Sequence, residues 1–144
     1  MLVHQILKSK ADDSVMTVPP ETSISDVVKI LADKGYGTVL VSKDGKSPDG
    51  ILSERDIVRK MATHGASVLD AKVKEFMTSK LITCTRSDSA ESVMSQMTEG
   101  RFRHMPVLED GQLVGLISLG DLVKARLAEL AMEKDALEGM IMGH

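Results

Sequence analysis

Two serine–aspartate pairs are the residues of this chain best placed to do chemistry. They are Ser53 with Asp56, in the segment GILSERDIV at residues 50–58, and Ser118 with Asp121, in GLISLGDLV at residues 115–123. At the start of a helix, a Ser-x-x-Asp sequence caps free backbone N–H groups, and such a helix end can also bind an anion. The carboxylate repels a phosphate but accepts hydrogen bonds from two adjacent hydroxyl groups. Each pair is therefore interpreted as a helix cap that can also hold a ribose beside a phosphate.

The sequence around each pair is duplicated, and the duplication predicts the elements that position the pairs. Short β-prone segments at residues 15–18 and 81–84 align, and capped helix starts follow at residues 22–26 and 88–92. Strands are then expected at residues 38–41 and 104–108, each followed by a turn, a short apolar segment and a second helix. Each unit is thus β-α-β-β-α. We predict an α+β fold in which the two repeats pack face to face as one pseudo-two-fold module.

The pattern divides the chain into a first repeat at residues 1–65, a second repeat at 66–128 and a C-terminal helical extension at 129–144. The link between the repeats is short, so independent domains are not expected. The last helix is predicted to run from Leu122 to about Glu138. Its apolar residues follow alternating four- and three-residue steps, interrupted by Lys134: Val123, Leu127, Leu130, Leu137 and Ile141. This helix either packs on its own domain or forms a dimer contact.

Composition narrows the classes of function. The net charge of -3 argues against a general nucleic-acid binder, which usually carries a basic patch. No apolar run is long enough for a membrane span, and the N-terminus lacks the regions of a signal peptide. The single cysteine, Cys84, fits a reducing compartment, so a cytoplasmic location is expected. The histidines lack the spacing of metal ligands. The sequence has no G-x-x-x-x-G-K-S/T loop, so phosphoryl transfer of that type is not expected. Each site would have one acid, so a pair of carboxylates for hydrolysis is not expected either. Neither a metal site nor an enzyme is predicted.

The two Gly-x-x-Ser-x-x-Asp motifs and the segment FRHMPV at residues 102–107 resemble a tandem pair of cystathionine-β-synthase (CBS) domains, often called a Bateman module. The resemblance covers essentially the whole chain except its C-terminal extension, and it is strongest to small stand-alone CBS-pair proteins. It implies pockets for adenosyl ligands: AMP, ADP, ATP, NAD or S-adenosylmethionine. It implies that Asp56 and Asp121 bind ribose hydroxyls and that Ser53 and Ser118 contact ribose or phosphate. It also implies adenine contacts from Thr17, Val18, Gly37, Thr38, Val39, Thr83, Cys84, His104, Met105 and Pro106.

The two sites are expected to be unequal. In the first motif, Arg55 supplies a permanent charge on a planar group that suits a phosphate. The second motif has Leu119 and Gly120 at the variable positions. Its phosphate partner is therefore expected among the basic residues before and at the start of the predicted strand: Arg101, Arg103 and His104. We expect an open first site and a basic second site with different affinities.

The expected function is a regulatory module that binds an adenine nucleotide and signals through a conformational change. With no catalytic domain expected on this chain, the signal must pass to an unknown effector protein or to another copy, and a homodimer is expected. No catalytic cofactor, nucleic-acid partner or membrane partner is expected. Two alternatives stay open: a protein-interaction scaffold with vestigial pockets, and a sensor of S-adenosylmethionine.

Overall fold

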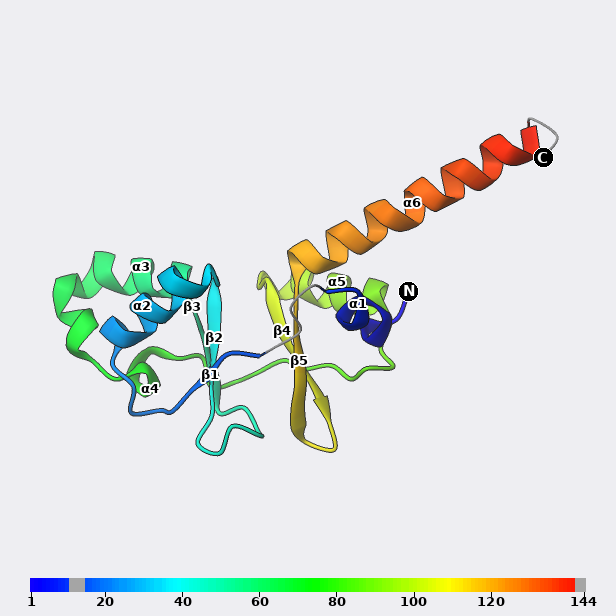
Figure 1. The fold of residues 1–144 in the computed structure, drawn as a ribbon. Helices are drawn as coiled ribbons and strands as arrows, with labels where there is room; N and C mark the ends of the chain where they lie inside the picture. The colour runs from blue at the N-terminus through cyan, green and yellow to red at the C-terminus, as the bar shows by residue number, and fades with distance from the viewer. Residues whose placement is uncertain (11–14, 142–144) are drawn as a thin grey trace.

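The computed structural model describes residues 1–10 and 15–141, which fold as two similar halves side by side (Figure 1). The first half contains β1 (Thr17–Val18), α2 (Ile24–Lys34), β2 (Thr38–Val41), β3 (Gly50–Ser53), α3 (Glu54–His64) and a short helix η1 (Gly65–Asp70). The second half contains α5 (Ala90–Gly100), β4 (His104–Glu109), β5 (Gln112–Ser118) and α6 (Leu119–Ile141). Two further helices are α1 (Val3–Ser9) and α4 (Val73–Phe76). The strands lie between the outer helices, and the predicted α+β class with two repeats is confirmed (Figure 1).

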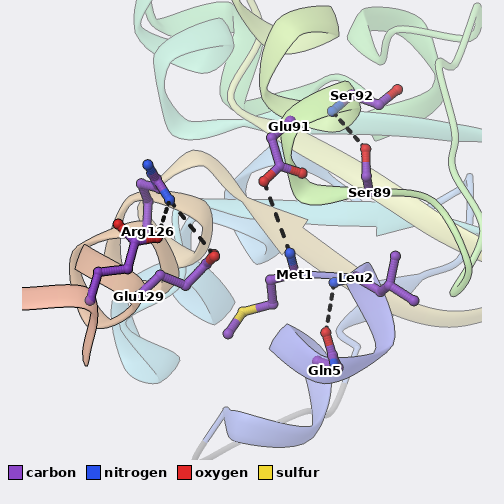
Figure 2. Close-up of polar contacts among 9 residues, drawn as sticks. Met1, Leu2, Gln5, Ser89, Glu91, Ser92, Arg126 and Glu129 are labelled. Atoms are coloured by element: carbon purple, nitrogen blue, oxygen red, sulfur yellow. Dashed lines mark hydrogen bonds and ion pairs between the residues drawn. The ribbon is translucent and has the colours of Figure 1, made fainter. Parts of the chain in front are cut away.

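Side-chain caps explain where the first helix of each repeat begins. At α2, the Ser23 hydroxyl accepts a hydrogen bond from the Asp26 backbone N–H at 3.1 Å. At α5, the Ser89 hydroxyl accepts one from the Ser92 N–H at 3.1 Å (Figure 2). Such caps satisfy N–H groups that have no partner within the helix. Both helices begin in the segments that the sequence predicted.

The sheets of the two halves differ by one strand. In the first half, β2 pairs in parallel with β1 and antiparallel with β3. In the second half, β4 pairs antiparallel with β5, and the strand predicted at residues 81–84 is reduced to one parallel bridge at Cys84. That prediction is therefore wrong beyond the bridge. Pro106 explains the difference, because it aligns with Leu40, whose N–H donates to the Met16 carbonyl at 3.1 Å. Proline has no N–H to donate at the matching place.

The two short helices complete the cores of the opposite repeats. α1 packs its buried apolar face into the core of the second half, whereas α4 packs into the core of the first. Backbone hydrogen bonds fix both helices: the Val3 N–H donates to the Asp88 carbonyl at 2.9 Å, and the Val73 N–H donates to the Thr22 carbonyl at 2.7 Å. Figure 2 shows the start of α1 beside the start of α5. The hydrophobic cores therefore cross the boundary between the repeats in the sequence.

The glycine of each motif makes room for one of these exchanged helices. A Cβ atom added at Gly115 would lie 2.9 Å from Leu7 Cδ1 in α1. A Cβ atom added at Gly50 would collide with the side chain of Met77, which follows α4. The motif glycines thus serve core packing, and their repetition follows from the repeated position of the two helices.

The C-terminal helix α6 runs from Leu119 to Ile141, so the predicted extended helix is confirmed and is longer than expected at both ends. Its first turns pack on the second half, where the Leu122 side chain is 1% exposed. The rest of α6 points away from both halves (Figure 1). Among the described residues, no helix combines the length and apolarity needed to cross a membrane.

Candidate functional site

The first serine–aspartate pair forms a reciprocal cap at the start of α3. The Ser53 hydroxyl accepts a hydrogen bond from the Asp56 N–H at 3.2 Å. In return, Asp56 Oδ2 accepts from the Ser53 N–H at 3.0 Å and from the Ser53 hydroxyl at 2.9 Å. Oδ1 of the same carboxylate has no donor among the described residues. Capping and ligand binding are therefore compatible at this pair.

The second pair is capped in a similar way, but a lysine also holds its carboxylate. The Asp121 N–H donates to the Ser118 hydroxyl at 3.0 Å, and the Ser118 N–H donates to Asp121 Oδ2 at 2.9 Å. Lys10, just after α1, places its Nζ 3.0 Å from the same Oδ2 and donates to the Leu116 carbonyl at 3.0 Å. Lys80 aligns with Lys10 in the repeat, yet it forms no ion pair with any described residue. The two pairs therefore differ in one respect: a lysine forms an ion pair with Asp121, whereas none does so with Asp56 among the described residues.

The first pair lines a cavity of about 470 Å³ that takes residues from both repeats, which we call the central cavity. Its lining comprises Gly37, Thr38, Ile51, residues 53–56, Arg59, Thr78, residues 80–82, residues 100–104 and Pro106. Eight predicted site residues meet here: Gly37, Thr38, Ser53, Arg55, Asp56, Arg103, His104 and Pro106. The Thr38 hydroxyl is buried and donates to the Leu52 carbonyl at 3.0 Å, so it is already used within the sheet. The central cavity thus joins one helix cap to segments of the other repeat.

A second cavity, of about 610 Å³, lies at the start of α6, and we call it the α6 cavity. Its lining comprises Arg103, His104, Ser118, Leu119, Gly120, Val123, Lys124 and Leu127. Asp121 is absent from this lining, and its carboxylate is the one that Lys10 holds. Arg103 and His104 line both cavities, so these two residues connect the sites.

Seven predicted site residues line neither cavity: Thr17, Val18, Val39, Thr83, Cys84, Met105 and Asp121. Four of them are core residues that are at most 4% exposed: Val18, Val39, Cys84 and Met105. A ligand could meet those four only through their backbone, and their adenine contacts stay predictions. Leu81 and Ile82, just before the predicted strand end, line the central cavity instead.

Positive charge is concentrated on the central cavity. Five cationic side chains line it, and none of them forms an ion pair with a described residue: Arg55, Arg59, Lys80, Arg101 and Arg103. The acids on the same lining are Glu54 and Asp56. Among the described residues, the cationic side chains that line the α6 cavity are only Arg103 and Lys124. Arg101, which was expected to serve the second site, follows α5 and lines the central cavity with the first pair. Its role in binding stays a prediction.

Burial and local charge shift the ionisation of groups near the cavities. Burial lowers the pKa of His104, and the Asp121 charge opposes the shift only in part. The imidazole is therefore neutral near pH 7 and can accept a hydrogen bond as well as donate one. At Asp121, burial raises the pKa, but the Ser118 N–H and Lys10 outweigh it, so the pKa is lowered and the carboxylate stays charged. Burial raises the pKa of the Cys84 thiol to about 12, which keeps it uncharged.

Sequence reasoning missed several residues of the central cavity, among them Arg59 and Lys80. Arg59 lies one helical turn after Arg55, so helical spacing could have found it. The sequence does not indicate that Lys80 lies beside the first pair. It lies there because the preceding segment joins the first sheet, where the Thr78 N–H donates to the Ile51 carbonyl at 2.9 Å. No group of His, Cys, Asp and Glu side chains suited to a metal ion occurs in the described part of the chain.

Known proteins resemble this chain in sequence and in fold. The CBS domain family model matches residues 6–63 and 73–128. The mitochondrial CBS domain-containing protein CBSX3 of Arabidopsis thaliana is 34% identical over 148 residues, which cover 98% of this chain and 72% of that protein. The crystal structure of a CBS-domain containing protein from Agrobacterium tumefaciens is 39% identical with a TM-score of 0.83, covering 88% of this chain and 99% of that one.

A more distant structure carries adenosyl ligands. The CBS domain pair of protein MJ0100 was solved in complex with 5'-methylthioadenosine and S-adenosylmethionine. It is 22% identical with a TM-score of 0.78, and the match covers 90% of this chain and 98% of that one. At this identity the likeness shows a shared fold.

Proposed function

The chain belongs to the CBS-domain family, and from that premise we propose that it is a regulatory module that binds an anionic adenine nucleotide in the central cavity. CBS pairs as a class are regulatory and bind adenosine-containing ligands. The observation that carries the proposal is that the Ser53–Asp56 cap and five cations without ion-pair partners line one cavity. That cavity offers a group for each part of a nucleotide.

The cap at the start of α3 suits a ribose that adjoins a phosphate. Asp56 Oδ1 can accept from a ribose hydroxyl while Oδ2 keeps its bonds to Ser53. The phosphate then lies among the cations, where Arg55 offers a planar fork of donors. Leu81 and Ile82 provide an apolar surface on the same lining for the adenine ring.

Charge favours AMP, ADP, ATP or NAD over S-adenosylmethionine. The nucleotides are anions, whereas S-adenosylmethionine carries a sulfonium and an ammonium against one carboxylate. A cavity lined by more cations than acids raises the local concentration of anions. S-adenosylmethionine is the second candidate, because the MJ0100 pair was solved with it.

Signalling would follow from the position of the central cavity between the repeats. A ligand there touches the α3 cap and the segment before β4, so it can favour one angle between the halves. It shifts that equilibrium only as far as it binds one arrangement better than the other. The change would pass to an effector protein or to another copy, with no catalytic step on this chain. The Arabidopsis relative is named as mitochondrial, and a cytoplasmic location stays a prediction here.

Isothermal titration calorimetry with AMP, ATP, NAD and S-adenosylmethionine tests the proposal. We expect nucleotide binding by the native protein and about 10- to 100-fold weaker binding by Asp56→Ala, because a hydrogen bond to a charged group contributes about 1.5–3 kcal/mol. Asp121→Ala is the matched control and keeps the affinity of the central cavity. Absence of binding by every ligand at millimolar concentration would favour the scaffold. A loss of stability in Asp56→Ala with unchanged affinity would leave this pair as a cap only.

A further inference from the structure

α6 carries an apolar face that no other described part of the chain covers. Its large apolar side chains are exposed: Val123 (44%), Leu127 (62%), Leu130 (43%), Leu137 (59%) and Ile141 (84%). Beyond its first turns the helix points away from both halves (Figure 1). Helices in proteins owe most of their stability to packing an apolar face, and an isolated helix is marginal in water. A partner that covers this apolar face would therefore stabilise the projecting part of α6.

The spacing of this face suits a second copy of α6 as the partner. With Lys134 included, the apolar face occupies positions 123, 127, 130, 134, 137 and 141, and we call this series the seam. The seam reads the same in both directions about residue 132. In an antiparallel pair, the first seam position therefore meets the last on the partner, the second meets the fifth, and the third meets the fourth. We propose that α6 forms a two-fold antiparallel coiled coil with α6 of a second copy.

Charge selects the antiparallel direction. In a parallel pair in register, Lys134 would face the partner's Lys134 inside the seam, where like charges repel. In the antiparallel pair Lys134 faces the partner's Leu130. Its Nζ remains 3.8 Å from Glu138 of its own helix. Beside the seam, the antiparallel pair also brings Lys124 toward the partner's Glu138. Two-fold symmetry makes this favourable contact twice.

The same symmetry brings Glu133 toward the partner's Glu133 on the other flank of the seam. Arg126 of the same helix lies 3.8 Å from this carboxylate and compensates its charge. A parallel pair would instead set Glu133 against the partner's Glu138, again twice. The antiparallel direction therefore has fewer like-charge contacts.

The pairing would also close the α6 cavity. Val123 and Leu127 belong to the seam and line this cavity. The partner's Ile141 and the partner's Leu137 lie opposite them in the antiparallel register and would cover that side of the cavity. The cavity at the start of α6 is thus completed by the second copy. This inference concerns a different surface from the central cavity, and it holds whether or not a nucleotide binds there.

Cysteine cross-linking tests the direction of the pair. Leu127→Cys protein is mixed with Leu137→Cys protein that carries a mass tag, under mild oxidation. We expect the mixed disulfide to form faster than either homodimeric disulfide, because only the antiparallel pair brings the two positions together. Cys84 is 4% exposed and does not compete. Homodimeric disulfides that form faster than the mixed one would overturn the antiparallel direction.

Charge exchange tests the strength of the pair. Lys124→Glu and Glu138→Lys are each expected to weaken dimerisation about 3- to 10-fold, and the double variant to restore it. Sedimentation velocity measures the dimer, and far-UV circular dichroism checks that each variant folds. A native protein that is monomeric at micromolar concentration would overturn the proposal. So would a dimer whose affinity is unchanged by Leu130→Lys.

Discussion

Replacing Lys10 with methionine is expected to open a second nucleotide site at Asp121. In the native protein the Lys10 ammonium lies on Asp121 Oδ2, the capping oxygen, and neutralises the carboxylate whose Oδ1 would accept from a ribose hydroxyl. A ribose at the second pair must therefore compete with the ammonium for the charge of this carboxylate, whereas Lys80 makes no such contact with Asp56. We expect one nucleotide per chain in the native protein and two in Lys10→Met.

The contacts of the Lys10 ammonium determine how strongly Lys10 weakens nucleotide binding at the second pair. Its Nζ lies 3.0 Å from Asp121 Oδ2 and 3.0 Å from the Leu116 carbonyl, and the Lys10 and Asp121 side chains are only 26% and 21% exposed. A hydrogen bond to a charged group contributes about 1.5–3 kcal/mol. Since about 1.4 kcal/mol is tenfold in affinity, Lys10 weakens the second site about 10- to 100-fold. Losing the ion pair should also lower the free energy of unfolding by about 1–3 kcal/mol, because the Asp121 carboxylate loses a partner.

Calorimetric stoichiometry is the assay, with ATP as the ligand and urea unfolding as the check on stability. Lys80→Met is the matched control, because Lys80 aligns with Lys10 but lines the central cavity. We expect Lys80→Met to weaken the existing site and to leave the stoichiometry at one. The reasoning is refuted if Lys10→Met still binds a single nucleotide, or if the native protein already binds two with similar affinity.

Two further predictions concern packing and pH. Gly115→Ala should lower the free energy of unfolding by about 1–3 kcal/mol, because the added Cβ would lie 2.9 Å from Leu7 Cδ1. In the double variant, adding Leu7→Val to Gly115→Ala should recover part of this loss. Urea unfolding measures the free energy of unfolding of both variants. His104 has a lowered pKa in the folded state, so its contribution to stability is present above about pH 6.5 and is lost as the pH falls below that value. Thermal unfolding from pH 7 into mild acid should therefore show a smaller decline in His104→Gln, and an identical decline would contradict the prediction.

The duplicated motif predicted most of the fold because helix caps and alternating apolar segments are local features. Ser23 and Ser89 cap the helices where the sequence indicated, and Ser53 caps α3 through its own motif. The absence of a strand at residues 81–84 can also be read from the sequence, since Pro106 stands in the pairing strand where the first repeat has Leu40. A comparison of the two repeats, residue by residue, contains that information.

The charge of the central cavity could not be predicted, because it depends on contacts between distant segments. Arg101 and Lys80 reach the first pair through the turn after α5 and through the pairing of Thr78 beside β3. The sequence around Arg101 or around Lys80 does not indicate that the residue lies beside the first pair. The Lys10 contact with Asp121 depends in the same way on the packing of α1 into the opposite half.

The exchange of α1 and α4 sets the order in which the two halves can be completed during synthesis. The first core needs α4, so it can close soon after Met77 leaves the ribosome. The second core joins α1, made first, to β5 and Leu122, made much later. Contacts between such distant segments form slowly, because a long loop must close first. A fusion or chaperone that holds α1 would therefore delay the second half alone, after the first half and its Ser53–Asp56 cap have formed.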